Sequence, residues 1–416
     1  MKISLNLTNE KREIFMEYFH ASYRKLAETP FSPSGQARHR SDGCYEIFLT
    51  FPLQINSGVA NLTWIIVIEK DGSLNQLEVQ SEVPEDSWSE AATKYVNEVL
   101  GAAFSGNLTK YFYRHYFCRM GAELHGEYWL PGFRFAPSMP EDENSYLMNA
   151  ERYFYIDQEV NSIDQVHGGD IATERAIRYS ARLSLILDVA LYQPSGGKRW
   201  FMMTDESGNL VSRREQLGFV APSRPTQMPR KGTECRLGEF GGSVLDENQN
   251  SSVSLLRCPV EARKILRGLN ECVPNIKEAF DSCARLYQTS LVAGRGFPTI
   301  RLAYKVGAIE SIIQKVDGFA SFSEFVRKEA DLSDGDNEFL DYLYGSVRSA
   351  HFHGGEFPLG EYRPRKWSLG LSDPSDTSRF NFNMVASKVL RKSIMNWVIR
   401  EVASKSDELI RPASLL

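Results

Sequence analysis

The chain has 416 residues, with 48 Lys and Arg against 53 Asp and Glu, which gives a formal net charge of −5. Hydrophobic residues make up 42% and charged residues 24%, the ordinary proportions of a folded globular protein. These values exclude a disordered tail protein, a collagen-like repeat and a highly basic protein that coats nucleic acid, and the length predicts two domains.

The first half of the chain changes secondary-structure type often, and it is expected to form an α+β domain of unknown type over residues 1–221. Apolar spacing predicts helices over residues 9–28, 87–100 and 171–192. Runs of β-branched and aromatic residues predict strands over 44–51, 62–68, 111–120 and 128–135. A further hairpin is expected between residues 200–203 and 210–211, across a turn that contains Gly208.

Residues 222–255 are rich in Pro, Gly, Ser and Asn, which predicts a linker or a long loop. Beyond them, apolar residues recur every three or four positions, so residues 256–416 are expected to form an all-α helical bundle. This half contains 23 Lys and Arg against 20 Asp and Glu, a net charge of +3, whereas the rest of the chain has a net charge of −8. An anionic partner is therefore expected to meet the helical half.

Targeting and cofactor signals are lacking in the sequence. No apolar run reaches the roughly 18 residues needed to cross a bilayer, and the N-terminus has no apolar signal core, so we expect a cytoplasmic protein without a membrane partner. The six cysteines include no Cys-x-x-Cys pair, which favours buried free thiols over a zinc site. We expect neither a metal nor a cofactor, since no phosphate-binding loop or metalloprotease motif is present either.

One group of residues in the helical half has the composition of a catalytic site. Arg348 is followed by His351 and His353, and then by Gly354-Gly355, which suit a helix end. Cleavage of an RNA phosphodiester without metal needs a base for the 2′-hydroxyl, an acid for the 5′-oxygen and a cation for the phosphorane. Histidine can serve as base and acid near neutral pH, and arginine offers a charged fork to the phosphate oxygens.

The spacing Arg348-x4-His353 resembles the motif of the HEPN superfamily, in which a histidine follows an arginine after four to six residues. The two helices before the motif also resemble those of the Apea-like HEPN group, at residues 284–287, 301–304 and 308–313. The resemblance covers roughly residues 259–404. Active members commonly carry Asn or Asp directly after the arginine, whereas Ser349 stands there in this chain.

The resemblance implies a HEPN-like helical bundle and a metal-independent endoribonuclease that works as a homodimer. His353 would deprotonate the 2′-hydroxyl, Arg348 would stabilise the phosphorane, and the product would end in a 2′,3′-cyclic phosphate. The resemblance also implies an acidic partner for Arg348 on a preceding helix, where Glu310 stands; the alternative is an ordinary charge flanking an amphipathic helix. Antiviral (antiphage) defence or a toxin-like role is the implied setting.

Helix geometry bears on the choice of base. At about 100° per residue, Arg348 and His353 lie about 140° apart around a continuing helix, whereas His351 lies about 60° from Arg348. His353 can therefore face Arg348 only if the last turn unwinds, which Gly354 permits, and His351 is expected to assist. The alternative is a surface helix end whose histidines merely favour the helix dipole.

Two further possibilities remain open. Arg363, Arg365 and Lys366, interleaved with Tyr362 and Trp367, could bind phosphate and stack a base, or could belong to a solvated loop. The whole module could also be non-catalytic and bind RNA, a nucleotide or a protein partner, an alternative that Ser349 favours.

Overall fold

The computed structural model describes residues 1–26, 36–56, 58–106, 108–130, 132–138, 151–194, 198–207, 209–217, 225–245, 255–362 and 374–408. The chain divides into two units, which are residues 1–111 with 160–172, and residues 112–159 with 173–416. An antiparallel sheet region lies at the N-terminus and a helical part at the C-terminus, so the chain mixes α and β structure as predicted.

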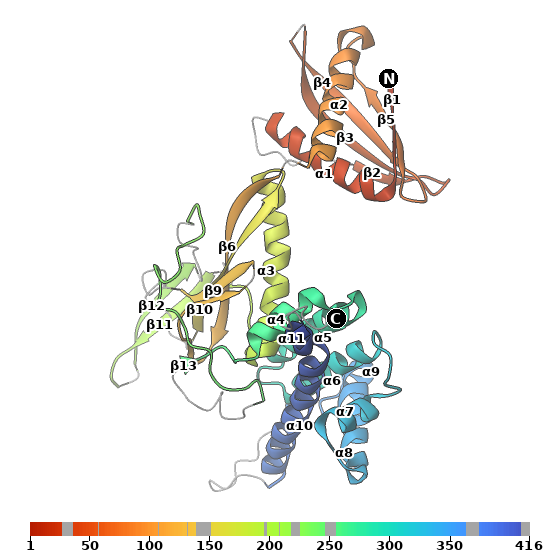
Figure 1. Cartoon of the computed structure of the whole chain (residues 1–416). Coiled ribbons are helices and arrows are strands. Elements are labelled where there is room, and N and C mark those ends of the chain that lie inside the picture. The colour runs from red at the N-terminus through yellow and green to blue at the C-terminus, as the bar shows by residue number, and fades with distance from the viewer. Residues whose placement is uncertain are drawn as a thin grey trace, which may run out of the picture. The chain divides into compact units, whose positions relative to one another are not determined.

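Unit 1, as far as it is described, is a five-stranded antiparallel sheet with two helices packed on one face (Figure 1). Its strands lie in the order β1 (Lys2–Leu7), β5 (Leu74–Gln80), β4 (Gly58–Ile68), β3 (Tyr45–Ile55) and β2 (Gln36–His39). Its helices are α1 (Asn9–Leu26) and α2 (Ser89–Ser105). The rings of Phe19, Trp64 and Tyr95 join α1, β4 and α2 in the core. The predicted helices and strands of this region are confirmed, and β1, β2 and β5 are additions to them.

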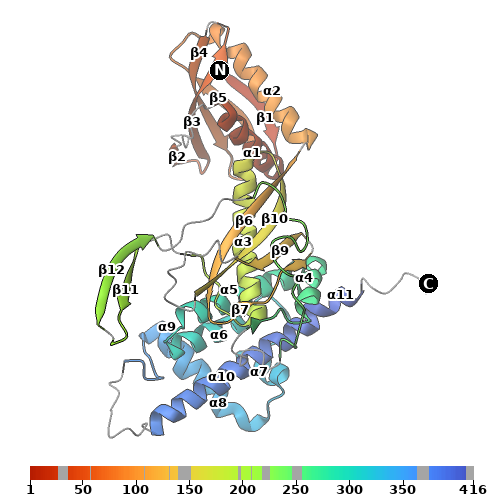
Figure 2. The same cartoon turned by 90° about the vertical axis from the view of Figure 1, so that its left-hand side faces the viewer.

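Unit 2 contains a second sheet, whose described strands lie beside the long helix α3 (Gln165–Leu187) (Figure 2). The strands lie in the order β6 (Thr109–Met120), β10 (Glu151–Ser162), β9 (Phe133–Pro137) and β8 (Tyr128–Leu130). The prediction missed β10, although its run Tyr153-Phe154-Tyr155-Ile156 has strand composition. The expected hairpin is present as β11 (Lys198–Thr204) and β12 (Leu210–Leu217).

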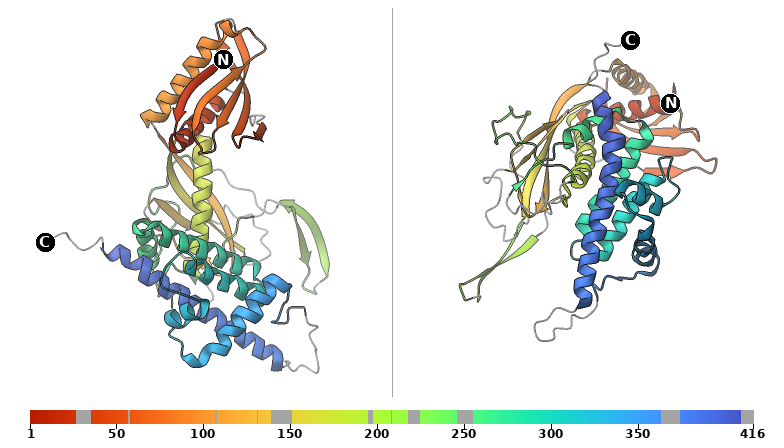
Figure 3. Two further views of the ribbon diagram at one scale, coloured as in Figure 1. Left: turned by 90° about the vertical axis from the view of Figure 1, so that its right-hand side faces the viewer. Right: turned by 60° about the horizontal axis from the view of Figure 1, so that its bottom comes forward.

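The described part of unit 2 from residue 262 onward is mainly helical. It comprises α4 (Ala262–Glu271), α5 (Pro274–Ala293), α6 (Pro298–Ile313), α7 (Phe322–Ala330), α8 (Asn337–Asp341), α9 (Ala350–Gly354), α10 (Pro374–Val398) and α11 (Ser404–Glu408), with π-helical segments at Tyr342–Ser349 and Ile399–Ala403. Prolines begin α5 and α6, where their missing N–H costs no hydrogen bond. Helix α10 packs along α6 and α7 (Figure 3). No helix among the described residues is long and apolar enough to cross a membrane.

The second sheet and the helices share one hydrophobic core, and this explains why the two units do not coincide with the predicted ranges 1–221 and 256–416. Phe117 and Phe135 of the sheet and Leu185 of α3 belong to the same buried cluster as Ile309 of α6 and Leu390 of α10. A sheet face that buries its apolar side chains against helices cannot be separated from them without exposing that core to water.

Residues 225–245 form a long loop, which was one of the two predicted alternatives for residues 222–255, and they are not a free linker. The loop is hydrogen-bonded to the chain before β8, because Glu127 N–H donates to Arg236 O at 2.9 Å and Gly238 N–H donates to Glu127 O at 3.0 Å. A Cβ on Gly126 would lie 2.4 Å from Gly238 Cα, so the close approach requires glycine there. Residues 222–224 and 246–254 lie outside the described part.

Candidate functional site

Arg348 lies near the end of the π-helical segment Tyr342–Ser349. Leu343 and Val347 of this segment are fully buried and fix it against the core, so that Arg348 projects from an anchored element. The π-helix, with its i→i+5 hydrogen bonds, is rare and is found frequently at functional sites. The predicted helix is present, but its π-helical conformation was not foreseen, because apolar spacing does not distinguish a π-helical turn from an α-helical one.

Glu310 of α6 binds the Arg348 guanidinium. Arg348 Nε and Nη2 lie 3.0 Å and 2.9 Å from the same carboxylate oxygen, Glu310 Oε2. The two side chains are 25% and 16% exposed, so the pair is half-buried. Helix α6 presents Glu310 here because Leu302, Val306 and Ile309 are buried on its other sides. The ion pair that the sequence led us to expect is therefore present, and it fixes the orientation of Arg348.

Two aromatic rings flank the same guanidinium. Arg348 Cζ lies 5.5 Å from the centre of the Tyr344 ring and 5.8 Å from the centre of the Phe352 ring. Both distances are within the range of cation–π attraction. Neither aromatic residue was among the predicted site residues, although Tyr344 and Phe352 both lie four positions from Arg348, a spacing that brings side chains together on a helix.

His351 is half-buried and held in place. Its Nδ1 lies 3.2 Å from Glu356 O, and its ring meets the Phe357 ring edge to face at 5.0 Å. A carbonyl accepts only from a protonated nitrogen, so this contact favours the tautomer with the proton on Nδ1 and leaves Nε2 as a proton acceptor. His351 therefore has an orientation and a tautomer suited to proton transfer.

His353 is exposed, and within the described ranges its side chain makes no hydrogen bond, ion pair or ring contact. Helix α9 continues through His353 and ends at Gly354, where Gly355, with φ of 66°, is the C-cap. The last turn has not unwound, so the condition under which His353 would face Arg348 of its own chain is not met. Ser349 is half-buried, and Arg363, Arg365 and Lys366 lie outside the described residues.

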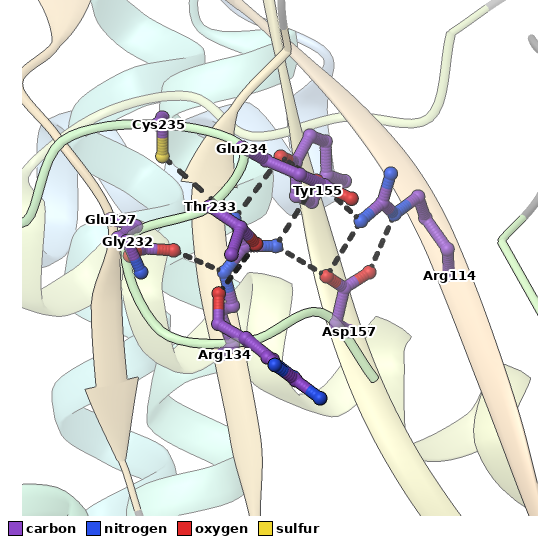
Figure 4. A network of polar contacts seen from close by, with 10 residues as sticks. Arg114, Glu127, Arg134, Tyr155, Asp157, Gly232, Thr233, Glu234 and Cys235 are labelled. Carbon is purple, nitrogen blue, oxygen red and sulfur yellow. Dashed lines mark hydrogen bonds and ion pairs between the residues drawn. The ribbon is translucent and has the colours of Figure 1, made fainter. Parts of the chain in front are cut away.

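A second group of polar side chains lies on the sheet of unit 2, on the face that the loop 225–245 crosses (Figure 4). Arg114 forms a bidentate pair with Asp157 at 2.7 and 2.9 Å, and Arg134 binds Asp157 and Glu127, each at 2.6 Å. Glu234 of the loop binds Arg114 and accepts a hydrogen bond from Tyr155 OH at 2.7 Å. The sequence analysis did not predict this group. The signal that could have indicated it is the presence of charged residues within strands of aromatic composition.

This sheet cluster is fully paired, and its charges are interdependent. The side chains of Arg134, Asp157 and Glu127 are 0% exposed. Burial raises the pKa of Asp157 despite the two arginines, whereas for Glu234 the effect of burial is outweighed by Tyr155 and Arg114, which lower its pKa. Paired buried charges of this kind fasten a loop to a sheet, so we assign the sheet cluster a structural role.

A third polar group joins the end of α3 to the helices. Tyr287 OH donates to Asp188 at 2.6 Å, and Arg391 donates to Leu185 O at 2.9 Å. Lys305, only 2% exposed, donates to Ser387 Oγ at 2.6 Å, and its burial lowers its pKa to about 8 although Asp188 opposes the shift. Among the described residues no three His, Cys, Asp or Glu side chains gather to hold a metal ion.

Comparisons with protein families, with characterised proteins and with solved structures found no match. The roles of the residues therefore rest on geometry and chemistry. By that standard the Arg348 site differs from the other two groups, because its cation is 25% exposed, keeps donors that Glu310 does not use, and precedes two histidines by three and five residues in the sequence. Glu310 occupies two of the five guanidinium N–H groups, which leaves three for phosphate oxygens.

Proposed function

We propose that the protein is a metal-independent endoribonuclease of HEPN type. The observation that carries the proposal is the Arg348 guanidinium, which Glu310 holds in place while it stays partly open to solvent, on the element directly before the helix that carries His351 and His353. A cation that is already held in place before the reaction is suited to stabilise the extra negative charge of a phosphorane. The resemblance of residues 259–404 to the HEPN superfamily supports the same assignment.

The reaction divides between an arginine and two histidines. His353 removes the proton of the 2′-hydroxyl, and the oxygen attacks the adjacent phosphorus. Arg348 stabilises the charge that gathers on the phosphorane oxygens, and the 5′-oxygen leaves as it takes up the proton that the histidine removed from the 2′-hydroxyl. His351, held by Glu356 O, assists proton transfer. The products are a 2′,3′-cyclic phosphate and a 5′-hydroxyl, and no atom of a metal or cofactor takes part.

The active form is a homodimer joined through the helical part. Helix α9 continues through His353 without unwinding, and the His353 side chain makes no hydrogen bond or ring contact with Arg348 of its own chain, so the histidine that acts with Arg348 comes from the second copy in our proposal. Two-fold symmetry then creates two such composite pairs in one cleft. Exposed apolar side chains on the first turns of α10 are available for the contact, namely Phe380, Met384 and Val385.

A second function is favoured by a specific observation. Ser349 occupies the position where active members of the superfamily commonly carry Asn or Asp, and Glu310 neutralises Arg348. A module with this site could bind RNA, a nucleotide or a protein partner without cleaving. By analogy with the superfamily, either function would serve antiviral (antiphage) defence or a toxin-like activity.

The experiment that tests the proposal uses end-labelled RNA incubated with the full-length protein in EDTA. Cleavage that leaves a 2′,3′-cyclic phosphate supports the endoribonuclease. RNA binding without cleavage by a homodimer of intact fold would favour the non-catalytic module instead.

A further inference from the structure

The aromatic rings of Tyr344 and Phe352 lie beside Arg348, although the binding of a phosphate to Arg348 does not require them. Tyr344 and Phe352 are 40% and 45% exposed, although each is a large aromatic side chain. Exposed aromatic surface beside a functional cation marks a site of interaction more often than a structural feature.

Each ring is supported from behind. The Tyr344 ring lies 5.7 Å from that of Phe322, a residue only 5% exposed. The Phe352 ring meets the ring of Tyr304 edge to face at 5.4 Å. The two rings are thus held by the core of the helical part while much of their surface stays open to solvent. Such rings can accept a planar ligand at a small entropic cost.

Both rings lie close to the same cation. Both ring centres lie within 6 Å of Arg348 Cζ, one ring from the residue four positions before it and one from the residue four positions after. A phosphate bound to Arg348 would therefore have an aromatic surface on each side. Stacking platforms next to a backbone-binding cation are the means by which proteins hold single-stranded nucleic acid without reading its sequence.

We propose that Tyr344 and Phe352 are stacking subsites for the two nucleobases that flank the phosphate bound by Arg348. The inference rests on the proposed function, which it deepens by naming two substrate-binding residues. Because every base has a π-face, the subsites select for unpaired nucleotides and tolerate many sequences. Bases within a duplex are already stacked on their neighbours and are excluded.

The test measures binding separately from cleavage. A short fluorescein-labelled 2′-fluoro oligonucleotide lacks the attacking hydroxyl, so fluorescence anisotropy reports its affinity for the full-length protein without turnover. Tyr344→Leu and Phe352→Leu remove each ring but keep an apolar side chain. Phe104→Leu, which alters a 49% exposed ring of unit 1, is the matched control.

We expect each subsite variant to bind roughly 5- to 100-fold more weakly, with the control unchanged. A series of oligonucleotides, each lacking the base at one position, then identifies the stacked nucleotides. The affinity of the wild-type protein should fall by a similar factor when either of two adjacent bases is removed. A variant that lacks the ring for one of these bases should lose no further affinity when that base is removed. If the ring substitutions weakened binding by the same factor for intact and for abasic oligonucleotides, the inference would be overturned.

The remaining outcomes separate the two proposals. Base-dependent binding through these rings, with no cleavage of ordinary RNA, would refute the endoribonuclease and leave the subsites standing. Cleavage that is indifferent to both rings and to abasic positions would overturn the subsites alone. The rings would instead belong to an interface between copies if Tyr344→Leu and Phe352→Leu dissociated a dimer in light scattering and weakened binding to intact and abasic oligonucleotides alike. That outcome would also overturn the inference.

Discussion

The guanidinium of Arg348 binds a single oxygen of Glu310 through two of its nitrogens, at 3.0 Å from Nε and 2.9 Å from Nη2. This contact joins the π-helical segment to α6 across 38 positions of sequence. It sets the direction of the remaining N–H groups, on which both the chemistry and the binding of phosphate depend in our account.

Replacing Glu310 by Gln should lower the turnover of RNA more than it lowers affinity. Glutamine retains one acceptor oxygen but loses the charge, so Arg348 is held less firmly while the local potential becomes more favourable for phosphate. We expect kcat to fall roughly 10- to 100-fold, with KM unchanged or lower. A rise in KM at constant kcat would show that Glu310 serves substrate binding rather than the positioning of Arg348.

Two histidine variants should separate the roles of His353 and His351. His353→Ala should reduce cleavage by roughly 100-fold or more, and His351→Ala should cost less. The His353 side chain is exposed and makes no hydrogen bond, ion pair or ring contact among the described residues, so its variant should melt at the wild-type temperature. A larger loss from His351→Ala would identify the histidine held by Glu356 O as the base, and helix geometry would then have been the better guide.

Mixing two inactive variants should restore activity if the catalytic pair spans two chains. In a dimer of Arg348→Ala with His353→Ala, one composite site retains both residues when Arg348 acts with the partner chain's histidine. An exchanged equal mixture should regain roughly a quarter of wild-type activity, because half of the dimers are mixed and each has one intact site. Pairs within one chain would give no recovery, and a protein that sediments as an active monomer would contradict the dimer itself.

Arg134→Met should be among the most destabilising single substitutions in unit 2. It leaves Glu127 and Asp157 buried without their common partner, which costs roughly 3–5 kcal/mol when a buried pair is broken. Urea unfolding followed by circular dichroism measures the change. Arg38→Met is the control. The Arg38 side chain pairs with Glu46 but is 66% exposed, so its loss should cost less than about 1 kcal/mol. Equal losses would show that the sheet cluster is not tightly coupled.

Lys305 should make the stability of the protein depend on pH in the alkaline range. Burial lowers its pKa to about 8 in the folded chain, whereas the unfolded side chain titrates near 10.4. Between these values the unfolded state binds more protons, so the contribution of Lys305 to the free energy of unfolding rises with pH. Between pH 7.5 and pH 10, the free energy of unfolding of the wild type should rise relative to that of Lys305→Met by on the order of 1–3 kcal/mol. A difference independent of pH would refute this assignment.

The helices were more predictable from sequence than the boundaries between units. Apolar spacing predicted a helical region over residues 256–416 because the buried residues of helices such as α5 and α6 recur with helical period. The unit boundary was not predictable in the same way. It depends on the packing of Phe117 and Phe135 against the helices, a contact between distant parts of the chain that no local pattern encodes.

The same distinction applies to the site. Arg348, His351 and His353 were found because they lie close together in sequence, and the resemblance supplied Glu310. The rings of Tyr344 and Phe352 were missed because aromatic residues at helical spacing are usually part of a core. Lys305 and the sheet cluster were missed because charges distant in sequence become neighbours only in the folded chain.

The central claim is that Arg348 stabilises the transition state of a metal-independent cleavage through the 2′-hydroxyl. Its most direct test is the rate at which the purified protein cleaves an end-labelled RNA in EDTA, beside the same sequence made as DNA and beside Arg348→Ala protein of equal thermal stability. The account predicts cleavage of the RNA only, with a 2′,3′-cyclic phosphate end, and a rate roughly 100-fold or more lower for Arg348→Ala. Equal rates for the two proteins, or cleavage of the DNA as well, would contradict it.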